Sequence, residues 1–424
     1  MNPSDLLILA GAVLAFALLS KRCEAGILTP PMAFTALGLL VSSAGLGLVE
    51  LSATSELIHS LAEITLILTL FTDASRINIT ELSAEHAIPI RLLLIGLPLA
   101  IIVGTGAAWL LFPALGLWGA AILGVILAPT DAALGQAVVA NDKVPQRIRQ
   151  SINVESGLND GLAFPALLIV AALAQADIDK STASWVMFVV LQIALGPVVG
   201  VIVGWFGSWA SERALERGWM DEVYLRIGTL AVPLVAYGAA EVTGGNGFIA
   251  AFACGLVVAA RSESVRRTAG AFGETEGQLL SLVVFTLFGA ILLPDVFSDV
   301  GWRHAFYAVL SLTVLRMVPV ALSLIGVAIR PVTVLFIGWF GPRGLASIIY
   351  LLLILEEYDV GDMTDVKATA ILTVALSVVL HGISAGPLAR AYGASAREEA
   401  HESRPIHGFA LRIRSHGQRR RRAS

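Results

Sequence analysis

The sequence predicts an all-α, polytopic membrane protein with about 13 transmembrane helices, arranged as two inverted six-helix repeats with broken, crossing helices. Three observations lead to this fold class. Of the 424 residues, 56% are hydrophobic and 14% are charged, and the mean hydropathy of +0.80 lies outside the range of soluble globular proteins. Apolar runs near the ~20 residues needed to cross a bilayer recur along the chain. Two of these runs contain a proline beside a charged residue.

The apolar runs follow one another through short polar connections, and each is predicted to form one span. The first lacks the basic start and the small-residue cleavage site of a secretory signal, so we expect it to be retained. The eighth and ninth meet at Gly244 and Gly245. The predicted spans are 6–20, 27–49, 57–72, 88–111, 117–139, 150–175, 184–210, 222–241, 246–260, 276–297, 304–328, 331–355 and 366–391.

The distribution of Lys and Arg over the connections predicts the orientation. With the N-terminus outside, the cytoplasmic connections and the C-terminal segment together carry 22 of the 28 basic residues. The opposite side carries only Lys180, Arg303 and Lys367. This imbalance satisfies the positive-inside rule and predicts a multi-pass protein of the plasma membrane with a cytoplasmic C-terminus. The two isolated cysteines, Cys23 and Cys254, support neither a disulfide framework nor a zinc site.

The fifth and twelfth spans are predicted to be broken helices. The fifth contains LAPTDAALG (Leu127–Gly135), and the twelfth contains FGPRGLAS (Phe340–Ser347). Proline lacks a backbone donor and clashes with the preceding turn, so each span should divide into two half-helices. The two spans lie an odd number of spans apart and therefore run in opposite directions. Matched broken helices of opposite direction are typical of an inverted-repeat secondary transporter with an ion site near the midplane.

Polar side chains inside the sixth span form the main part of a candidate ion site. Ser156 and Asp160 are four residues apart and share one face of a helix, and Glu155 and Asn159 form a second pair on the adjacent face. Charged and polar groups at such a depth are costly and usually functional. The sequence therefore predicts two neighbouring faces of the sixth span that are rich in oxygen atoms.

The break of the fifth span is expected to complete this site. Asp131 lies directly after Pro129 and Thr130, and the end of a half-helix leaves backbone carbonyls free, including that of Thr130. These oxygens suit a hard monovalent cation, with Asp131, Ser156 and Asp160 as the expected side-chain ligands. Neither segment contains histidine or cysteine, which argues against a transition metal.

The charges inside the spans suggest a division of roles. Desolvation disfavours the charged form of a carboxyl group, so we expect a proton and a cation to compete for the same oxygens, with Asp160 as the principal carrier. Arg316 and Arg343 lie inside spans and need partners, for which Glu155, Asp131 and Asp160 are the acidic candidates. We predict that Arg316 pairs with Glu155 and that Arg343 supports the crossing of the two broken helices.

At these residues the chain resembles a known family, the NhaP and eukaryotic NHE branch of the cation:proton antiporter superfamily. The segments that carry the resemblance occur in family order and cover nearly the whole membrane part. The arginine at 343 lies in a Gly-Pro-Arg-Gly run, where the family more usually has Gly-Leu-Arg-Gly. The matching segments are LFTDA (70–74), APTDAA (128–133), NVESGLNDG (153–161), GFIAAFACGLVVA (247–259), the in-span Arg316 and GPRGLAS (341–347).

The resemblance implies a homodimer in the lipid bilayer that exchanges Na⁺, with Li⁺ also accepted, for H⁺ by alternating access. It implies ion ligation by Thr130, Asp131, Glu155, Ser156, Asn159 and Asp160, with the Glu155–Arg316 ion pair as a family feature. Electrogenic relatives carry an aspartate at the position of Asn159, so electroneutral exchange is implied here, with no cofactor and no nucleic-acid partner. The implied division is an interface domain (1–87 and 176–297), a core domain (88–175 and 298–393) and a short basic cytoplasmic tail (394–424).

Several alternatives remain beside this interpretation. The chain could exchange K⁺ for H⁺, or it could be a cation channel or a sensor on the same fold. An enzyme is the weakest interpretation, because the sequence has no phosphate loop, no GxSxG motif and no HExxH motif. Asp73 and Arg76 are expected to pair at the cytoplasmic edge rather than to bind ions, and His381 is expected to be a satisfied packing residue.

Overall fold

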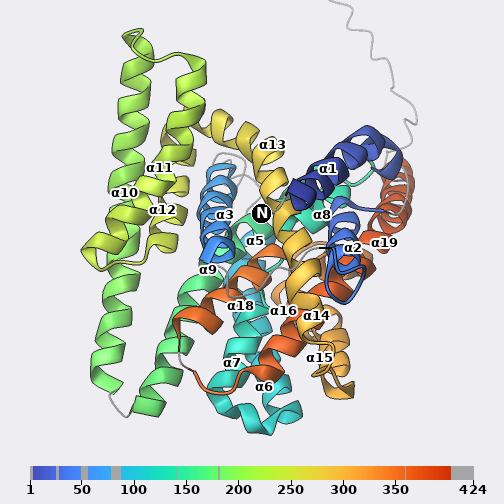
Figure 1. Cartoon of the computed structure of the whole chain (residues 1–424). Helices are drawn as coiled ribbons and strands as arrows, with labels where there is room; N and C mark the ends of the chain where they lie inside the picture. Colours follow the sequence, from blue (N-terminus) through green and yellow to red (C-terminus); the bar gives the residue numbers. More distant parts are fainter. Residues whose placement is uncertain are drawn as a thin grey trace, which may run out of the picture.

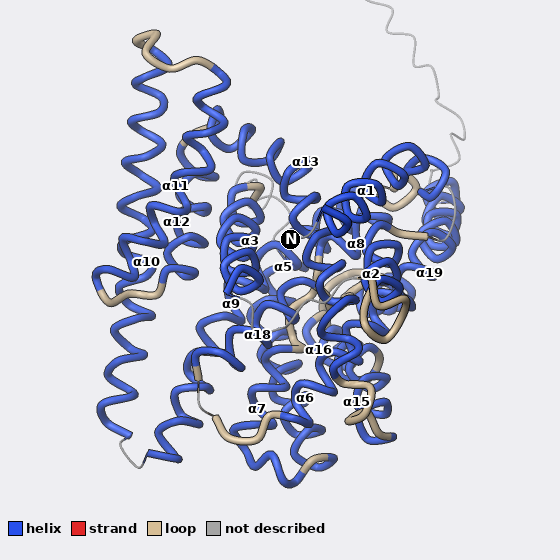
Figure 2. Tube along the Cα trace, in the orientation of Figure 1, coloured by secondary structure: helices blue, strands red, loops and turns tan. Residues whose placement is uncertain are grey.

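The computed structural model describes residues 3–24, 28–48, 56–77, 87–139, 141–179, 182–358 and 360–402, and over these ranges the chain is entirely helical (Figure 1, Figure 2). The first half of the chain forms α1 (Pro3–Glu24), α2 (Pro30–Val41), α3 (Glu56–Ser75), α5 (Ala87–Arg91), η1 (Leu92–Gly96), α6 (Leu97–Leu111), η2 (Pro113–Leu115), α7 (Gly116–Ile126), α8 (Ala132–Val139), α9 (Gln146–Asp179) and α10 (Thr182–Glu216). The second half forms α11 (Glu222–Thr243), α12 (Gly247–Arg261), α13 (Glu263–Leu287), η3 (Phe288–Leu292), α14 (Leu293–Asp295), α15 (Trp302–Leu312), α16 (Val314–Ser323), α17 (Pro331–Trp339), α18 (Leu345–Glu357) and α19 (Thr364–Glu402).

The predicted spans appear as helices in the predicted order. Within the described ranges, 7 helical segments are long and apolar enough to cross a membrane. Shorter apolar helices include α2, α12 and the half-helices on either side of the breaks. These seven segments are Ala87–Leu111, Gln146–Gln175, Val190–Glu216, Glu222–Thr243, Glu263–Asp295, Trp302–Ser323 and Thr364–Ser395.

Both predicted breaks are present. The fifth span divides between α7 and α8, and the twelfth divides between α17 and α18. The turn at Gly244 and Gly245 likewise separates α11 from α12. Gly244 ends α11 in the left-handed conformation (φ 81°), and the side chain of Asn246 accepts a hydrogen bond from the backbone N–H of Ile249 (3.1 Å) to begin α12. Glycine tolerates the first geometry, and asparagine favours the second.

The predicted span over 304–328 appears as one apolar segment, Trp302–Ser323, whose helix is interrupted at Thr313 (φ −119°, ψ −93°) between α15 and α16. The hydroxyl of Thr313 donates to the carbonyl of Val309 (2.6 Å), while its backbone N–H donates to the carbonyl of Leu310 (3.1 Å). A threonine hydroxyl that takes the carbonyl four residues back competes with the regular helical ladder. No proline or glycine marks this position, so the sequence pattern did not indicate it.

The helices form two groups with α13 running between them (Figure 1). On one side α10, α11 and α12 pack against one another, and α12 also packs on α3. On the other side α6 packs on α7, α7 on α9, and α15 on α19, while α18 touches α7, α9 and α19. The largest cluster of buried apolar side chains lies around α7, α9, α18 and α19 and continues into α3, α12 and α13. The two helix breaks lie beside this cluster.

Candidate functional site

The two broken helices are joined at their breaks by backbone contacts that involve Asp131. Its backbone N–H donates to the carbonyl of Pro342 (2.8 Å). Its carboxylate accepts from the backbone N–H of Leu345 (2.6 Å), the first residue of α18, and more weakly from that of Leu134 in α8 (3.4 Å). The first N–H groups of a helix have no partner within the helix and carry partial positive charge. Asp131 therefore caps two half-helices at once.

Side chains from the twelfth span in turn stabilise the break of the fifth span. Nη1 of Arg343 donates to the carbonyl of Ala128 and to that of Pro129 (3.0 Å). The hydroxyl of Ser347 donates to the carbonyl of Ile126, the last residue of α7 (2.7 Å). These carbonyls lie at the C-terminal end of a half-helix, where intrahelical donors are lacking. Arg343, which is 1% exposed, thus supports the crossing as predicted from its place in the sequence.

Two glycines of the GPRG run let the broken helices approach this closely. A Cβ atom at Gly344 would collide with the carboxylate of Asp131, and one at Gly341 would collide with the guanidinium of Arg316 and lie 3.0 Å from Cγ2 of Thr130. A side chain at either position would displace a charged group from the crossing. The absence of a side chain at these two glycines therefore allows the two breaks to pack closely.

The oxygen-bearing side chains of α9 meet the break between α7 and α8. The hydroxyls of Thr130 and Ser156 lie 3.0 Å apart within hydrogen-bond distance, and Nδ2 of Asn159 donates to Oγ1 of Thr130 (2.7 Å). Oδ1 of Asn159 and Oδ1 of Asp160 are both buried and accept no hydrogen bond from the described residues. A buried acceptor without a donor is costly, so both atoms are available to a ligand.

The predicted pair of Glu155 and Arg316 is present. Oε1 of Glu155 lies 2.6 Å from Nη1 of Arg316, and both side chains are only 3% exposed. Oε2 of Glu155 and Nε and Nη2 of Arg316 have no partner among the described residues. The pair is therefore fixed by one strong, charge-assisted contact. It joins α9 to α16 close to the crossing.

Two residues near the site were not assigned to it by the sequence. The backbone carbonyl and Cβ of Asp73 in α3 face Gly157 of α9. The expected edge position of Asp73 thus lies close to the α9 carboxylates. Tyr350 of α18 donates its hydroxyl to the backbone carbonyl of Asp160 (2.5 Å). A tyrosine in an apolar run gives no sequence signal for such a contact.

His381 lies beside the crossing and is bonded through both ring nitrogens. Nδ1 lies 3.1 Å from the hydroxyl and the carbonyl of Ser377, and Nε2 lies 2.9 Å from the carbonyl of Trp339. The hydroxyl of Ser377 also accepts from the backbone N–H of Arg343 (2.7 Å). Both nitrogens are occupied locally, in agreement with the packing role expected for this histidine.

The chemistry of the site is that of oxygen ligands. Within the described ranges no group of three or more His, Cys, Asp or Glu side chains could hold a metal ion. The available acceptors are hydroxyl, amide and carboxylate oxygens together with backbone carbonyls, which suit hard cations. Glu155 and Asp160 each keep one open carboxylate oxygen among the described residues. The other oxygen of Glu155 contacts Arg316, so Asp160 is the better candidate to hold either a cation or a proton.

Comparison with known proteins relates the chain to one family of membrane proteins. The family model "Sodium/hydrogen exchanger, transmembrane" matches residues 8–391. A Na(+)/H(+) antiporter of Schizosaccharomyces pombe is 28% identical over 267 residues, which are 58% of this chain and 56% of that protein. The Na(+)/H(+) antiporter NhaP of Pseudomonas aeruginosa is 27% identical over 343 residues, 76% of this chain and 78% of that protein.

A solved structure shares the fold. The sodium proton antiporter MjNhaP1 from Methanocaldococcus jannaschii at pH 8 superposes with a TM-score of 0.73 over 91% of this chain and 98% of that chain, at 20% identity. The chain spans only about half the length of the S. pombe relative.

Proposed function

The chain belongs to the sodium/hydrogen exchanger family, and from this premise we propose that it is a secondary antiporter that exchanges a monovalent cation for a proton across the plasma membrane. The match covers residues 8–391 and makes the chain a multi-pass membrane protein of a transporter family. Na⁺ is the proposed cargo, Li⁺ is accepted, and K⁺ is the alternative cargo.

One observation carries the proposal: Asn159 and Asp160, successive residues of α9, each keep an open, buried oxygen among the described residues, and Asn159 contacts Thr130 where the two broken helices cross. We assign cation ligation to this pair with Ser156, Asp131 and the backbone of Thr130. Loss of the cation leaves Asp160 as a desolvated charge, which is costly, and a proton relieves that cost. Cation and proton therefore occupy the same group in turn.

Glu155 has a different proposed role within the same ligand set. Its contact with Arg316 keeps one oxygen occupied by a charge, so it shapes the site and holds α9 against α16 while Asp160 alternates. Asn159 carries no charge in either state. One proton exchanged for one monovalent cation leaves the net charge of the site unchanged, and the proposed exchange is electroneutral.

The proposed domain movement and the proposed dimer also rest on membership of the exchanger family. We propose a homodimer in which a core domain (88–175 and 298–393) moves against an interface domain (1–87 and 176–297). The N-terminus lies outside, and the basic segment 394–424 lies in the cytoplasm. The reciprocal capping at the crossing supports motion of the two broken helices as one unit, because separating them would expose buried N–H and C=O groups.

The test uses everted membrane vesicles that carry a pH gradient. Addition of Na⁺ or Li⁺ should dissipate the gradient, and clamping the membrane potential should leave the rate unchanged. Asp160→Asn should abolish the response. Asp142→Asn is the matched control, because Asp142 has a 95% exposed side chain in the connection before α9, and this variant should keep the wild-type rate.

Each outcome discriminates between the candidate functions. A response to K⁺ alone selects the K⁺/H⁺ antiporter. Current across a bilayer at symmetric pH, without proton movement, selects a channel. Wild-type exchange by Asp160→Asn would contradict the assignment of the site, and no response to any of the three cations would contradict antiport itself.

A further inference from the structure

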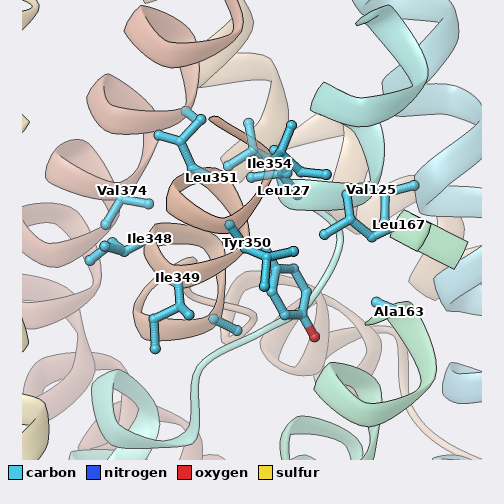
Figure 3. Close-up of a cluster of buried hydrophobic side chains, with 14 of the residues drawn as sticks. Val125, Leu127, Ala163, Leu167, Ile348, Ile349, Tyr350, Leu351, Ile354 and Val374 are labelled. Carbon is cyan, nitrogen blue, oxygen red and sulfur yellow. The ribbon is translucent and has the colours of Figure 1, made fainter. Parts of the chain in front are cut away.

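Tyr350 lies next to the proposed site but is absent from the ligand set. It is located on α18, one helix turn after the crossing contacts of that helix begin, and its side chain is fully buried. Figure 3 shows its ring reaching from α18 toward α9, with the hydroxyl oxygen on the side of Ala163. The hydroxyl donates to the backbone carbonyl of Asp160 (2.5 Å), and the ring packs against that of Phe164 (centroids 5.4 Å apart).

The turn of α9 that carries Asp160 has little support from its own helix. Pro165 has no N–H to donate to the carbonyl of Gly161, four residues before it. Gly157 and Gly161 flank Asp160 and allow α3 and α12 to approach α9 closely. Glycines in a helix interior leave the backbone more free to move. This turn is therefore weaker than the rest of α9.

One oxygen of the Asp160 carboxylate receives no support from the side chains of the described residues that would compensate for this weakness. Its Oδ1 is buried without a donor in the part of the chain that the structure describes, so the position of this oxygen follows the position of the backbone. The carbonyl of Asp160 has a second lone pair beyond the one used by a helix N–H. The hydroxyl of Tyr350 is an external donor to that carbonyl and holds the turn from outside α9.

We propose that Tyr350 is a positioning residue for cation exchange, which fixes through its hydroxyl the α9 turn that bears Asp160 and thereby sets the cation affinity of the site. This inference rests on the proposed antiport function. Both α9 and α18 belong to the proposed core domain, so the hydrogen bond is kept in both orientations of the site. Its loss should therefore weaken cation binding from both sides of the membrane.

The test is Tyr350→Phe, which removes only the hydroxyl. The matched control is Tyr307→Phe, because Tyr307 is equally buried and its hydroxyl also donates to a backbone carbonyl, that of Gly104 (3.1 Å), in the contact between α15 and α6. One hydrogen bond to a neutral acceptor corresponds to an about three- to ten-fold change in an equilibrium constant. We expect the apparent KM for Na⁺ to rise by that factor in Tyr350→Phe, with Vmax per folded protein unchanged.

Two further measurements distinguish a residue that positions Asp160 from one that only stabilises the fold. Because cation and proton compete, weaker cation binding should move the pH profile at fixed Na⁺ upward by about half to one pH unit. In detergent, the same variant should need a correspondingly higher Li⁺ concentration to reach half of the thermal stabilisation that Li⁺ gives the wild type. The KM rise should appear in everted and in right-side-out vesicles.

The outcomes are distinct. No exchange by the wild type overturns the proposed function itself. Wild-type exchange with an unchanged KM in Tyr350→Phe overturns the positioning role alone, as does an equal KM rise in Tyr307→Phe. A Tyr350→Phe protein that is no longer monodisperse, or that loses Vmax at constant KM, identifies a purely structural contact and also overturns it.

Discussion

Replacing Arg316 by Met removes the positive partner of Glu155 while keeping an unbranched apolar side chain in the same space. The two charges lie 2.6 Å apart and are 3% exposed, so the carboxylate left behind cannot be solvated by a simple rotation. Breaking a buried pair by removing one partner costs about 3–5 kcal/mol, because an uncompensated charge stays buried. For 424 residues, with an unfolding entropy of about 2.1 cal/mol/K per residue, this corresponds to a fall in Tm of about 3–6 °C.

The double variant Glu155→Gln/Arg316→Met removes both charges and tests whether the loss comes from the unpaired charge. It should be more stable than Arg316→Met alone, with a coupling energy of about 2–4 kcal/mol in the double-mutant cycle. The measurement is thermal unfolding of the purified protein in detergent, followed by the fluorescence of its 8 tryptophans.

Arg303→Met is the control for loss of an arginine. Arg303 is exposed, and its guanidinium lies 5.8 Å from the ring centroid of Trp302, so its removal should shift Tm by less than about 1 °C. A wild-type Tm for Arg316→Met would refute the reasoning. The reasoning would also be refuted if the loss of stability in the double variant equalled the sum of the losses in the two single variants.

Three other predictions follow from particular residues. Asn159→Asp adds a titratable group to the site, so exchange should become sensitive to membrane potential; equal rates with and without a potassium–valinomycin clamp would contradict this. Gly161→Ala places a Cβ atom against the ring of Phe252 and should lower stability by about 1–3 kcal/mol, whereas Gly270→Ala, which meets nothing within 4 Å, should leave it unchanged. Hydrogen bonds at the start of α19 hold the pKa of the Asp362 carboxyl below its ordinary value. Because the pKa is lowered, these bonds stabilise the first turn of α19 at pH values above the ordinary pKa of the carboxyl. This stabilisation is lost as the pH falls through the pKa of the carboxyl in the folded protein. Asp362→Ala should therefore speed amide exchange in that turn at neutral pH, and the difference from wild type should vanish in acid.

Much of the architecture could be predicted because its causes are local. Hydropathy alone indicates where the chain crosses the bilayer, and a proline beside a charge indicates where a span cannot continue as one helix. The break at Thr313 was not predicted. It depends on whether the hydroxyl or the backbone N–H of Thr313 donates to the carbonyl of Val309. That choice is made by a side-chain rotamer, which sequence patterns do not reveal.

Some features of the candidate site could also be predicted from the sequence, and others could not. The pairing of Glu155 with Arg316 could be inferred because two buried opposite charges in one membrane protein have few other partners. The double capping by Asp131 could not, because it depends on the register at which the two breaks meet. Neither could the contact of Tyr350 with the carbonyl of Asp160, which joins residues 190 positions apart.

By itself the sequence determined the all-helical class, the order of the apolar helices and the two proline breaks, because each follows from local polarity and backbone chemistry. Only the tertiary structure decided which oxygen atoms remain open. Asp131 lies among N–H donors at two helix ends, whereas Oδ1 of Asp160 meets none among the described residues. The physical reason is that hydrogen bonds at a helix crossing are shared between segments more than 200 residues apart, so the packing of the two breaks decides which oxygen atoms receive a donor and which stay open.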